Sequence, residues 1–413
     1  MGVGNRLGLI AFIILAAGCT RTAGQDVAGD GSLQGSLAAG STQVLMIRPG
    51  SASRYQGLGF ASLPDRGDLA AYPGHNVRQD GAYTWHRTDV SEQHALNAIA
   101  QGRLRLTTPT GEILDFEYDR RIEHPSGDWT WIGHLIGDEG AQTVLTFGDH
   151  AVFGTIAQPN KPPLRLTVRD GLGWVVETDP RKLAGIVNAA TRPQHPDYRI
   201  VPRAELPGRN KSFDPQTAAD DTKSGTSQSA AAPAQSATST VASTVDLLVG
   251  YTAGFATANG GASGALTRLN YLVDVVNAAY VNSQVDAQVR LVHAMQVTYT
   301  ETNTNEIALE QLSGYKSGTG SIPPNSAFTA LRAARETYKA DLVSLVRDFK
   351  NPEQDGCGIA WLLGGGLQGI GPNEGWDELG YSVVGDGTDA GTDGKTYFCR
   401  DEALVHELGH NMG

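Results

Sequence analysis

Basic residues are few in this sequence, and they do not cluster. The 413-residue chain carries 32 Lys and Arg against 44 Asp and Glu, which gives a formal net charge of −12 and an isoelectric point near 5.3. Nucleic acids and anionic membrane surfaces select clustered Lys and Arg side chains, so the composition excludes a nucleic-acid partner. The hydrophobic fraction of 40% is ordinary for a globular protein and excludes disorder of the whole chain.

Long apolar runs are also scarce, and the one near the N-terminus is too short for a membrane span. This run follows Arg6 and is itself followed by small residues and Cys19. That is the order expected of a secretory signal over residues 1–19. The letters LAAGC resemble a bacterial lipobox, in which the cysteine becomes the lipidated first residue, although a small residue stands where leucine is usual. We therefore expect an exported protein: either an outer-membrane-anchored lipoprotein modified at Cys19, or an extracellular protein cleaved nearby. Residues 20–41 are expected to be flexible.

Cysteine is scarce as well, since only Cys357 and Cys399 remain when Cys19 is set aside. An even pair in an exported chain predicts a disulfide. The alternative is a structural zinc site in which both thiolates join His406 and His410, whose spacing such sites use. The two cysteines lie about forty residues apart without a Cys-x-x-Cys knuckle, which favours the disulfide.

A segment poor in core-forming residues divides the sequence in two. Residues 221–244 contain no aromatic residue and predict an exposed linker, which we place at 208–244. Residues 42–207 show short alternating runs separated by Gly-Asp and Asp-Gly turns, which is typical of antiparallel hairpins in a β-rich domain. Histidines of this region are expected to be ordinary sheet residues rather than metal ligands, among them His124, His134 and His150.

Residues 245–413 change to a mixed α/β pattern. Apolar residues between Leu266 and Tyr280 recur at steps of three and four, which predicts a long helix with one apolar face, and Asn325 is expected to cap a further helix. Strands are predicted at VDLLVGY, AQVRLVHAMQVTYT, DLVSLVRDF, GIAWLLGG and YSVV. Strands alternating with helices imply a largely parallel sheet, so the whole chain is a mixed α+β protein.

An acidic, glycine-rich stretch occupies residues 351–394. Its letters GDGTDAGTDG suggest calcium, but they lack the Asp-x-Asp-x-Asp-Gly order of an EF-hand loop. We interpret the stretch as a solvated loop.

The final residues, RDEALVHELGHNMG, hold a pattern with specific chemistry. Asp401 and Glu402 suit a helix N-terminus, and Gly413 stands where the helix would end. His406 and His410 are four residues apart, so both imidazoles project from one helix face and can reach a single ion.

Glu407 lies between these histidines and completes the chemistry of a hydrolase. Zinc lowers the pKa of a water molecule, and Glu407 can take the proton and return it to the leaving amine of a cleaved peptide. Two helix histidines that merely pack or face solvent are the alternative, but the pattern arises by chance in only about one chain in a hundred. We predict one catalytic Zn²⁺ ion and polypeptide substrates.

Gly413 also distinguishes among zinc proteases. In the pattern His-Glu-x-x-His-x-x-Gly-x-x-His, the glycine lets the chain leave the helix so that a third ligand reaches the metal. The motif therefore resembles that of the metzincins. Together with VDLLVGYT, CGIAWL and GYSVV, it is similar to the bacterial peptidyl-Asp metallopeptidases, relatives of the reprolysin-like group, and the β-rich region and linker resemble that family's propeptide.

The resemblance implies a zinc endopeptidase made as a secreted precursor, with a preference for bonds on the amino side of acidic residues. His406 and His410 carry over as zinc ligands, and Glu407 carries over as the catalytic base. The third ligand and the supporting Met turn would lie beyond Gly413, so we expect a catalytic domain truncated at the active-site helix and inactive as it stands. The propeptide is expected to inhibit its own catalytic domain by steric cover or by a carboxylate on the metal.

A substrate-binding edge is expected at GIAWLLGG, where an extended peptide would pair with the backbone of Gly358, Ile359, Ala360 and Trp361. An acidic preference needs a cation, for which Lys395 and Arg400 are the local candidates. The alternative for the whole chain is a lipid-anchored, non-enzymatic surface module that holds a structural zinc.

Overall fold

The computed structural model describes residues 63–74, 76–169, 171–187, 196–201, 205, 243–365, 375–391 and 394–413, and these fall in one compact unit. The signal peptide, Cys19, the segment 20–41 and the linker up to residue 242 lie outside them, so the expectations for those parts stay predictions. Within the described ranges, no helix has the length and apolar character needed to cross a membrane.

The region before the linker folds into an antiparallel sheet, as its alternating runs predict. Its nine strands follow the order β2-β3-β11-β10-β9-β8-β7-β6-β5. They are β2 (Val77–Asp80), β3 (Tyr83–Arg87), β5 (Arg103–Thr107), β6 (Ile113–Glu123), β7 (Trp129–Leu135), β8 (Asp138–Phe147), β9 (Val152–Gln158), β10 (Lys161–Arg169) and β11 (Leu172–Thr178). We call residues 63–187 the β-rich domain, which also contains β1 (Ala70–Ala71), β4 (Asp89–Val90), α1 (Glu92–Gln101) and α2 (Pro180–Val187).

This domain has a hydrophobic core of its own, in which Phe116, Trp129, Trp131 and Leu145 are buried. Period-two alternation explains the burial, because every second residue of a strand faces the same side of the sheet.

The region after the linker folds around a second sheet, in which parallel pairs predominate. The order is β12-β18-β19-β17-β13-β14, and β20 pairs with β19. The strands are β12 (Tyr198–Arg199), β13 (Ser243–Thr252), β14 (Ala287–Val297), β17 (Leu342–Asp348), β18 (Gly358–Trp361), β19 (Tyr381–Ala390) and β20 (Thr396–Cys399). Strands β14, β13, β17 and β19 are parallel neighbours, whereas β18 and β20 run antiparallel to β19.

The helices of this region are α3 (Ala253–Ala258), α4 (Ala262–Asn282), α5 (Asn305–Ser313), α6 (Thr329–Tyr338) and α7 (Ala403–Met412). Short 3₁₀ helices η3 (Ser326–Phe328) and η4 (Asp377–Leu379) and a hairpin of β15 (Tyr315–Lys316) and β16 (Gly320–Ser321) complete it. Asn325 acts as a cap, because its Oδ1 accepts from the backbone N–H of Ala327, but it begins η3, which leads into α6.

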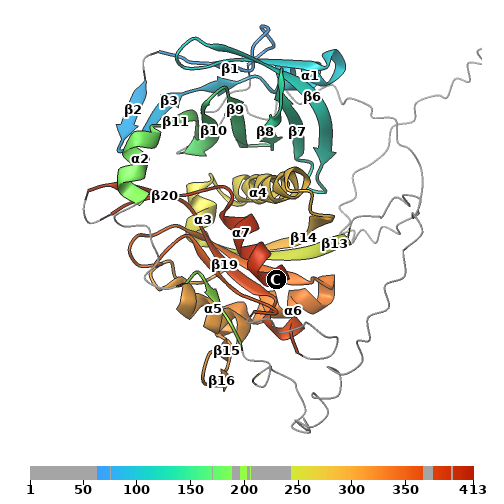
Figure 1. Cartoon of the computed structure of the whole chain (residues 1–413), viewed down its shortest axis with the longest axis vertical. Coiled ribbons are helices and arrows are strands. Elements are labelled where there is room, and N and C mark those ends of the chain that lie inside the picture. The colour runs from blue at the N-terminus through green and yellow to red at the C-terminus, as the bar shows by residue number, and fades with distance from the viewer. Residues whose placement is uncertain are drawn as a thin grey trace, which may run out of the picture. The chain divides into compact units, whose positions relative to one another are not determined.

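Helix α4 is the element on which both sheets pack (Figure 1). The sequence predicts one apolar face, and this face packs on the second sheet, with Leu269 and Val276 in the core. The opposite face is buried as well, because the β-rich domain contacts the polar side chains of Arg268, Asn270 and Asp274. Helical periodicity did not reveal this second contact.

Other stretches also differ from the sequence-based expectations. Residues 385–390, interpreted as part of a solvated loop, belong to β19, where Asp386 is buried against Arg268. Residues 198–199, assigned to the β-rich region, form β12 of the second sheet. His124 follows β6 instead of lying within a strand, because its imidazole is directed to a partner on α4.

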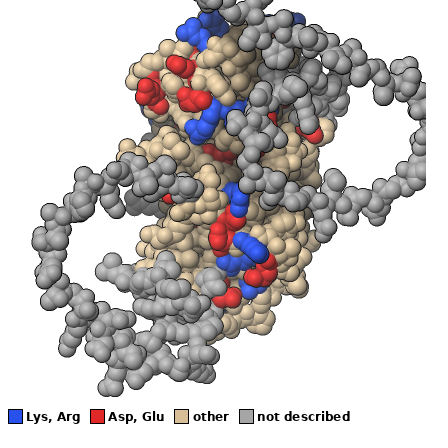
Figure 2. All heavy atoms as spheres, turned by 90° about the vertical axis from the view of Figure 1, so that its right-hand side faces the viewer, with Lys and Arg blue, Asp and Glu red and all other residues tan. Residues whose placement is uncertain are grey.

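Cys357 and Cys399 are joined in a disulfide that connects the segment before β18 to the end of β20. Because both sulfur atoms are used, neither can supply a thiolate, and the alternative zinc site with His406 and His410 does not form. On the face drawn in Figure 2, basic and acidic side chains are interspersed.

Candidate metal centre

Helix α7 has one buried face and one face that carries the two histidines. Leu404 and Leu408 are buried in the core that includes α4. Asn411 Nδ2 donates to the carbonyl oxygens of Trp361 and Tyr381, at 2.9 and 3.1 Å, which ties the helix to β18 and β19. These contacts fix the rotation of α7 and leave the face of His406 and His410 directed away from the core.

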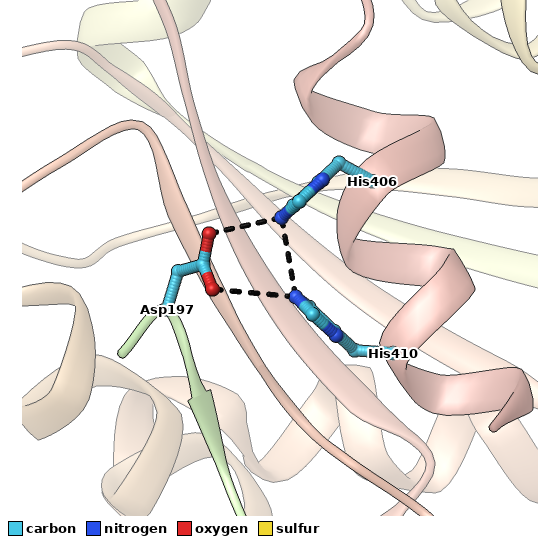
Figure 3. A group of neighbouring side chains, drawn as sticks. All are labelled: Asp197, His406 and His410. Carbon is cyan, nitrogen blue, oxygen red and sulfur yellow. Dashed lines mark hydrogen bonds and ion pairs between the residues drawn. The ribbon is translucent and has the colours of Figure 1, made fainter. Parts of the chain in front are cut away.

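The two imidazoles meet at their Nε2 atoms, which lie 3.2 Å apart. Asp197 supplies the third donor, with its Oδ2 at 2.9 Å from His406 Nε2 and its Oδ1 at 3.4 Å from His410 Nε2 (Figure 3). All three donor atoms lie within 4.8 Å of one another. Three N and O donors from two distant segments, converging on one point, fit the protein ligand set of a catalytic zinc.

Asp197 is held in place by the backbone that follows it. Strand β12 pairs in parallel with β18, with Tyr198 opposite Ala360 and Arg199 opposite Trp361. The Asp197 carbonyl accepts a hydrogen bond from the Ala360 N–H at 3.2 Å. Arg199 Nε donates to Glu306 Oε1 at 2.7 Å and anchors the other end of the short strand. Sequence analysis missed Asp197, because its neighbourhood carries no motif and its role depends on a pairing across more than a hundred residues.

Glu407 lies between the histidines in sequence but is directed into the protein. It is only 2% exposed, and its Oε2 has no hydrogen-bond partner among the described residues. Burial, with the charge of Asp197 as a second cause, raises the pKa of Glu407 to about 9. Gly358 makes room for it, since a Cβ at that position would lie 2.4 Å from Glu407 Oε1.

The histidines differ from Glu407 in exposure. The side chain of His406 is 54% exposed and that of His410 is 18% exposed. Burial and the neighbouring His406 lower the pKa of His410, although Asp197 acts in the opposite direction. A neutral imidazole with a free Nε2 lone pair is the form that binds a metal.

The residues of the expected substrate edge form β18, whose outer side is paired with β12 instead of being open. A small pocket beside it is lined by residues of both strands and of α5, among them Asp197, Arg199, Asn305, Glu306 and Gly358. The candidate cations Lys395 and Arg400 are exposed and flank β20, which packs near Tyr83 and Trp85 of the β-rich domain. Neither lines this pocket; Arg199 does.

Two segments of the chain match known families. Residues 240–413 match the family model described as metallo-peptidase family M12B, reprolysin-like, and residues 75–182 match the model described as a BamI lipocalin-like domain. A curated relative, the peptidyl-Asp metalloendopeptidase of Pseudomonas aeruginosa, is 30% identical over 175 residues. The match covers 41% of this chain and 25% of the relative, so the chain spans about a quarter of that protein.

Solved structures give weaker similarity. Metalloproteinase-II from Bacteroides fragilis aligns with a TM-score of 0.39 and 9% identity, over 75% of this chain and 80% of that one. A chain in the structure of a chaperone-substrate complex aligns with a TM-score of 0.29 and 18% identity, over 42% of this chain and 24% of that one.

Proposed function

Since residues 240–413 belong to the reprolysin-like metallopeptidases of family M12B, we propose that the chain is the precursor of an exported, metzincin-type zinc endopeptidase. The observation that carries this proposal is the convergence of His406, His410 and Asp197 on one point, next to the buried carboxylate of Glu407. Polypeptides are the proposed substrates.

His406 and His410 would hold the zinc through their Nε2 atoms, with an oxygen of Asp197 as the third donor in the precursor. A zinc ion bound there lowers the pKa of water and polarises the peptide carbonyl. In the metzincin pattern the third ligand is a histidine three residues after the glycine, so Asp197 would be a donor additional to that set.

Glu407 is the proposed proton carrier. Its carboxylate would accept the proton of the attacking water and deliver it to the amine nitrogen of the leaving peptide. Gly358 supports this role, because any side chain there would displace the carboxylate.

The segment around Asp197 accounts for latency in this proposal. Asp197 occupies the donor position that an incoming peptide carbonyl and water would need, and β12 occupies the edge of β18 along which an extended substrate would pair. We therefore expect the 413-residue chain to hydrolyse casein negligibly. Processing within residues 208–244 would break the covalent connection between the propeptide, which includes Asp197, and the catalytic domain.

Substrate preference and location are further parts of the proposal. The name of the Pseudomonas relative supports a preference for acidic residues after the cut, with Lys395, Arg400 or Arg199 as cations to test. Cleavage of a proteome-derived peptide mixture should enrich Asp and Glu after the cut. The signal at residues 1–19 supports export, and mass spectrometry of the mature N-terminus decides between a lipid on Cys19 and free secretion.

Two substitutions test the proposed chemistry. Glu407→Gln should keep zinc at a stoichiometry of about one and abolish peptide hydrolysis in the processed enzyme, because the amide cannot accept the proton. His406→Ala should lose both, because a ligand is gone. His150→Ala, which changes a histidine of the β-rich domain outside the cluster, is the control. Undiminished hydrolysis by Glu407→Gln would contradict the proposal.

A further inference from the structure

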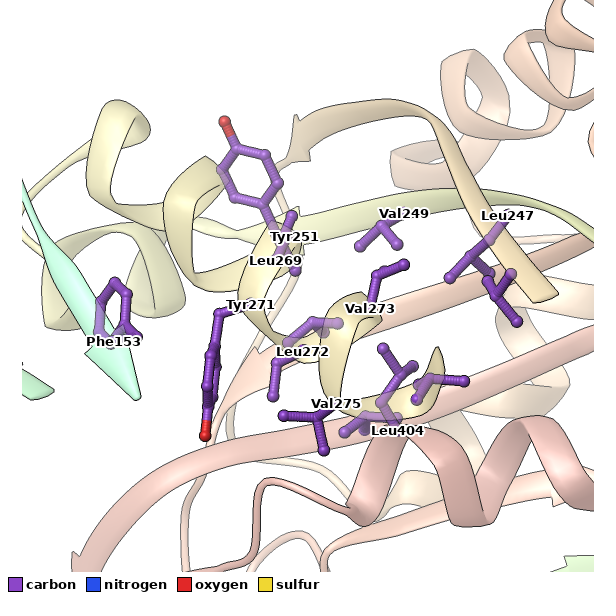
Figure 4. Close-up of a cluster of buried hydrophobic side chains, with 14 of the residues drawn as sticks. Phe153, Leu247, Val249, Tyr251, Leu269, Tyr271, Leu272, Val273, Val275 and Leu404 are labelled. Atoms are coloured by element: carbon purple, nitrogen blue, oxygen red, sulfur yellow. The ribbon is translucent and has the colours of Figure 1, made fainter. Parts of the chain in front are cut away.

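The β-rich domain is attached to residues 243–413, which we call the catalytic region, through one face of helix α4, in addition to the linker and β12. Apolar side chains from both regions share a single core, in which Ile132, Val144 and Phe153 of the β-rich domain pack with helix α4. Phe153 faces Tyr271, with ring centroids 6.4 Å apart (Figure 4). The contact therefore resembles the interior of a domain more than a wet surface contact.

Buried polar contacts fix this interface near the middle of α4. His124 Nε2 lies 3.0 Å from Asp274 Oδ2, and Thr130 also donates to that carboxylate. Asp128 Oδ2 accepts from Asn270 Nδ2 at 2.8 Å. These pairs join the turn between β6 and β7 to α4.

A buried ion cluster fixes the interface next to the active-site helix. Arg165 of β10 donates to Asp401 Oδ1 at 3.0 Å, and Arg268 of α4 binds both Asp401 and Asp386. Tyr271 donates to Asp401 Oδ2 at 2.9 Å and contacts the Thr155 hydroxyl. Asp401 stands two residues before α7, near the helix N-terminus where its charge was expected, and its carboxylate binds the arginines of this cluster.

The charges of the cluster balance only while the β-rich domain is present. Arg165 and Arg268 face Asp386 and Asp401, two cations against two carboxylates, and the side chains of all four are at most 12% exposed. Removal of the β-rich domain takes Arg165 away and leaves one guanidinium between two carboxylates. An uncompensated buried charge is costly, so separation of the two regions is opposed by electrostatics as well as by lost apolar contact.

We propose that cutting the linker does not release the β-rich domain, which stays bound to α4 as a separate, non-covalent inhibitory chain. The proposed cut lies after residue 207, so Asp197 and β12 remain on the β-rich fragment and are kept in the metal site by the bound domain. Release then requires a second event, namely degradation of the β-rich fragment itself. The inhibitory part of this inference rests on the proposed function; the binding does not.

The affinity of the interface decides whether the two fragments stay together after the linker is cut. A linker of this kind gives the tethered domain an effective concentration on the order of millimolar, and this contribution vanishes when the linker is cut. A buried apolar contact together with desolvated charge pairs can hold two fragments together at micromolar concentration and below. A small polar contact cannot do so.

The test uses the full chain with a site for a sequence-specific protease inserted between residues 221 and 236. After complete cutting, the fragments should co-elute at a one-to-one ratio in native size-exclusion chromatography at micromolar protein, without zinc or substrate. Elution as two separate folded fragments overturns the inference. Loss of the complex leaves the peptidase proposal standing, and absence of hydrolysis leaves this inference standing, so the two failures are distinguishable.

Matched variants test the cluster. Arg165→Met should weaken the cut complex on the order of 100-fold, because it leaves the Asp401 carboxylate short of a cation. Lys161→Met removes a cation from the same strand, but Lys161 pairs with Glu112 inside the β-rich domain, so the complex should be unchanged. Equal affinity for both variants overturns the role of the cluster.

A second variant covers the case in which Arg165→Met fails to fold. His124→Ala removes the contact to Asp274 between the two regions and should weaken the cut complex by about tenfold. Thermal unfolding of each uncut variant shows whether it is folded. A His124→Ala complex as tight as that of Lys161→Met contradicts the proposed interface.

Discussion

Histidines occur in two different arrangements in the two regions of this molecule. In the β-rich domain, His86, His94, His124 and His134 each have a carboxylate oxygen within 3.0 Å of a ring nitrogen, and each has a different carboxylate nearest to it. In the catalytic region, His406 and His410 share the single carboxylate of Asp197 and have their Nε2 atoms 3.2 Å apart.

The difference indicates which arrangement fits a metal site. A histidine paired with its own carboxylate is satisfied by one shared proton and needs no ion. Two imidazole nitrogens this close can share one proton in a hydrogen bond, but together with the carboxylate of Asp197 they also form a set of three donors that fits a single cation. Residue type alone does not distinguish a paired histidine from a candidate metal ligand. The number of histidines that share one carboxylate does distinguish them.

The largest expected effect is on zinc. His410→Ala should remove measurable stoichiometric zinc binding, because the loss of a direct ligand exceeds the roughly 10–100-fold cost of outer-shell changes. His134→Ala should bind zinc like the unmodified chain, since His134 is paired with Asp119. Titration against a chromophoric chelator measures both. Equal zinc affinity in the two variants would remove the distinction drawn here.

The next effect concerns stability and compares a buried with an exposed arginine. Arg268→Met should lower the free energy of unfolding by about 3–5 kcal/mol, because the buried ion pair of Asp386 is lost and Asp401 keeps only its contact with Arg165. Arg290→Met is the control: Arg290 is 64% exposed in its pair with Asp246, and about 1 kcal/mol or less is expected. Chemical denaturation measures the difference, and similar losses would show that burial of the cluster is unimportant.

Acid should weaken the same cluster. Burial alone raises the pKa of Asp401, but the charges of Arg165 and Arg268 and their hydrogen bonds hold it well below its usual range. A depressed folded-state pKa contributes stability that is present above the unfolded value near 4 and is lost as the pH falls further. The gap in unfolding free energy between the unmodified chain and Asp401→Asn should therefore narrow below about pH 4. A constant gap between pH 7 and pH 3 would contradict the assignment.

The smallest effect is expected for a single histidine pair. His134→Ala should change the free energy of unfolding by about 1 kcal/mol or less, because the side chains of His134 and Asp119 are 18% and 30% exposed and water replaces the lost contact. Thermal and chemical unfolding measure it. A loss of several kcal/mol would mean that the paired histidines carry more of the fold than their exposure indicates.

The sequence determined the local chemistry of this protein. Alternating runs predict the antiparallel sheet, apolar periodicity predicts α4, and the spacing of His406 and His410 places both imidazoles on one face of α7, because each of these features depends on neighbours within a few residues. The interpretation of residues 385–390 as a loop was wrong for the complementary reason: the acidic residue Asp386 is acceptable in a strand only because a distant Arg268 neutralises it.

Only the tertiary structure decided what lies across from these elements. Asp197 reaches the histidines because β12 pairs with β18. Asp401 takes part in an ion cluster because Arg165 of β10 lies beside it, and α4 is buried on both faces because the β-rich domain covers it. These contacts join residues that are far apart in the chain. The free energy that favours them comes from burial and charge neutralisation between segments, and neither effect produces a periodic pattern in the sequence of either segment.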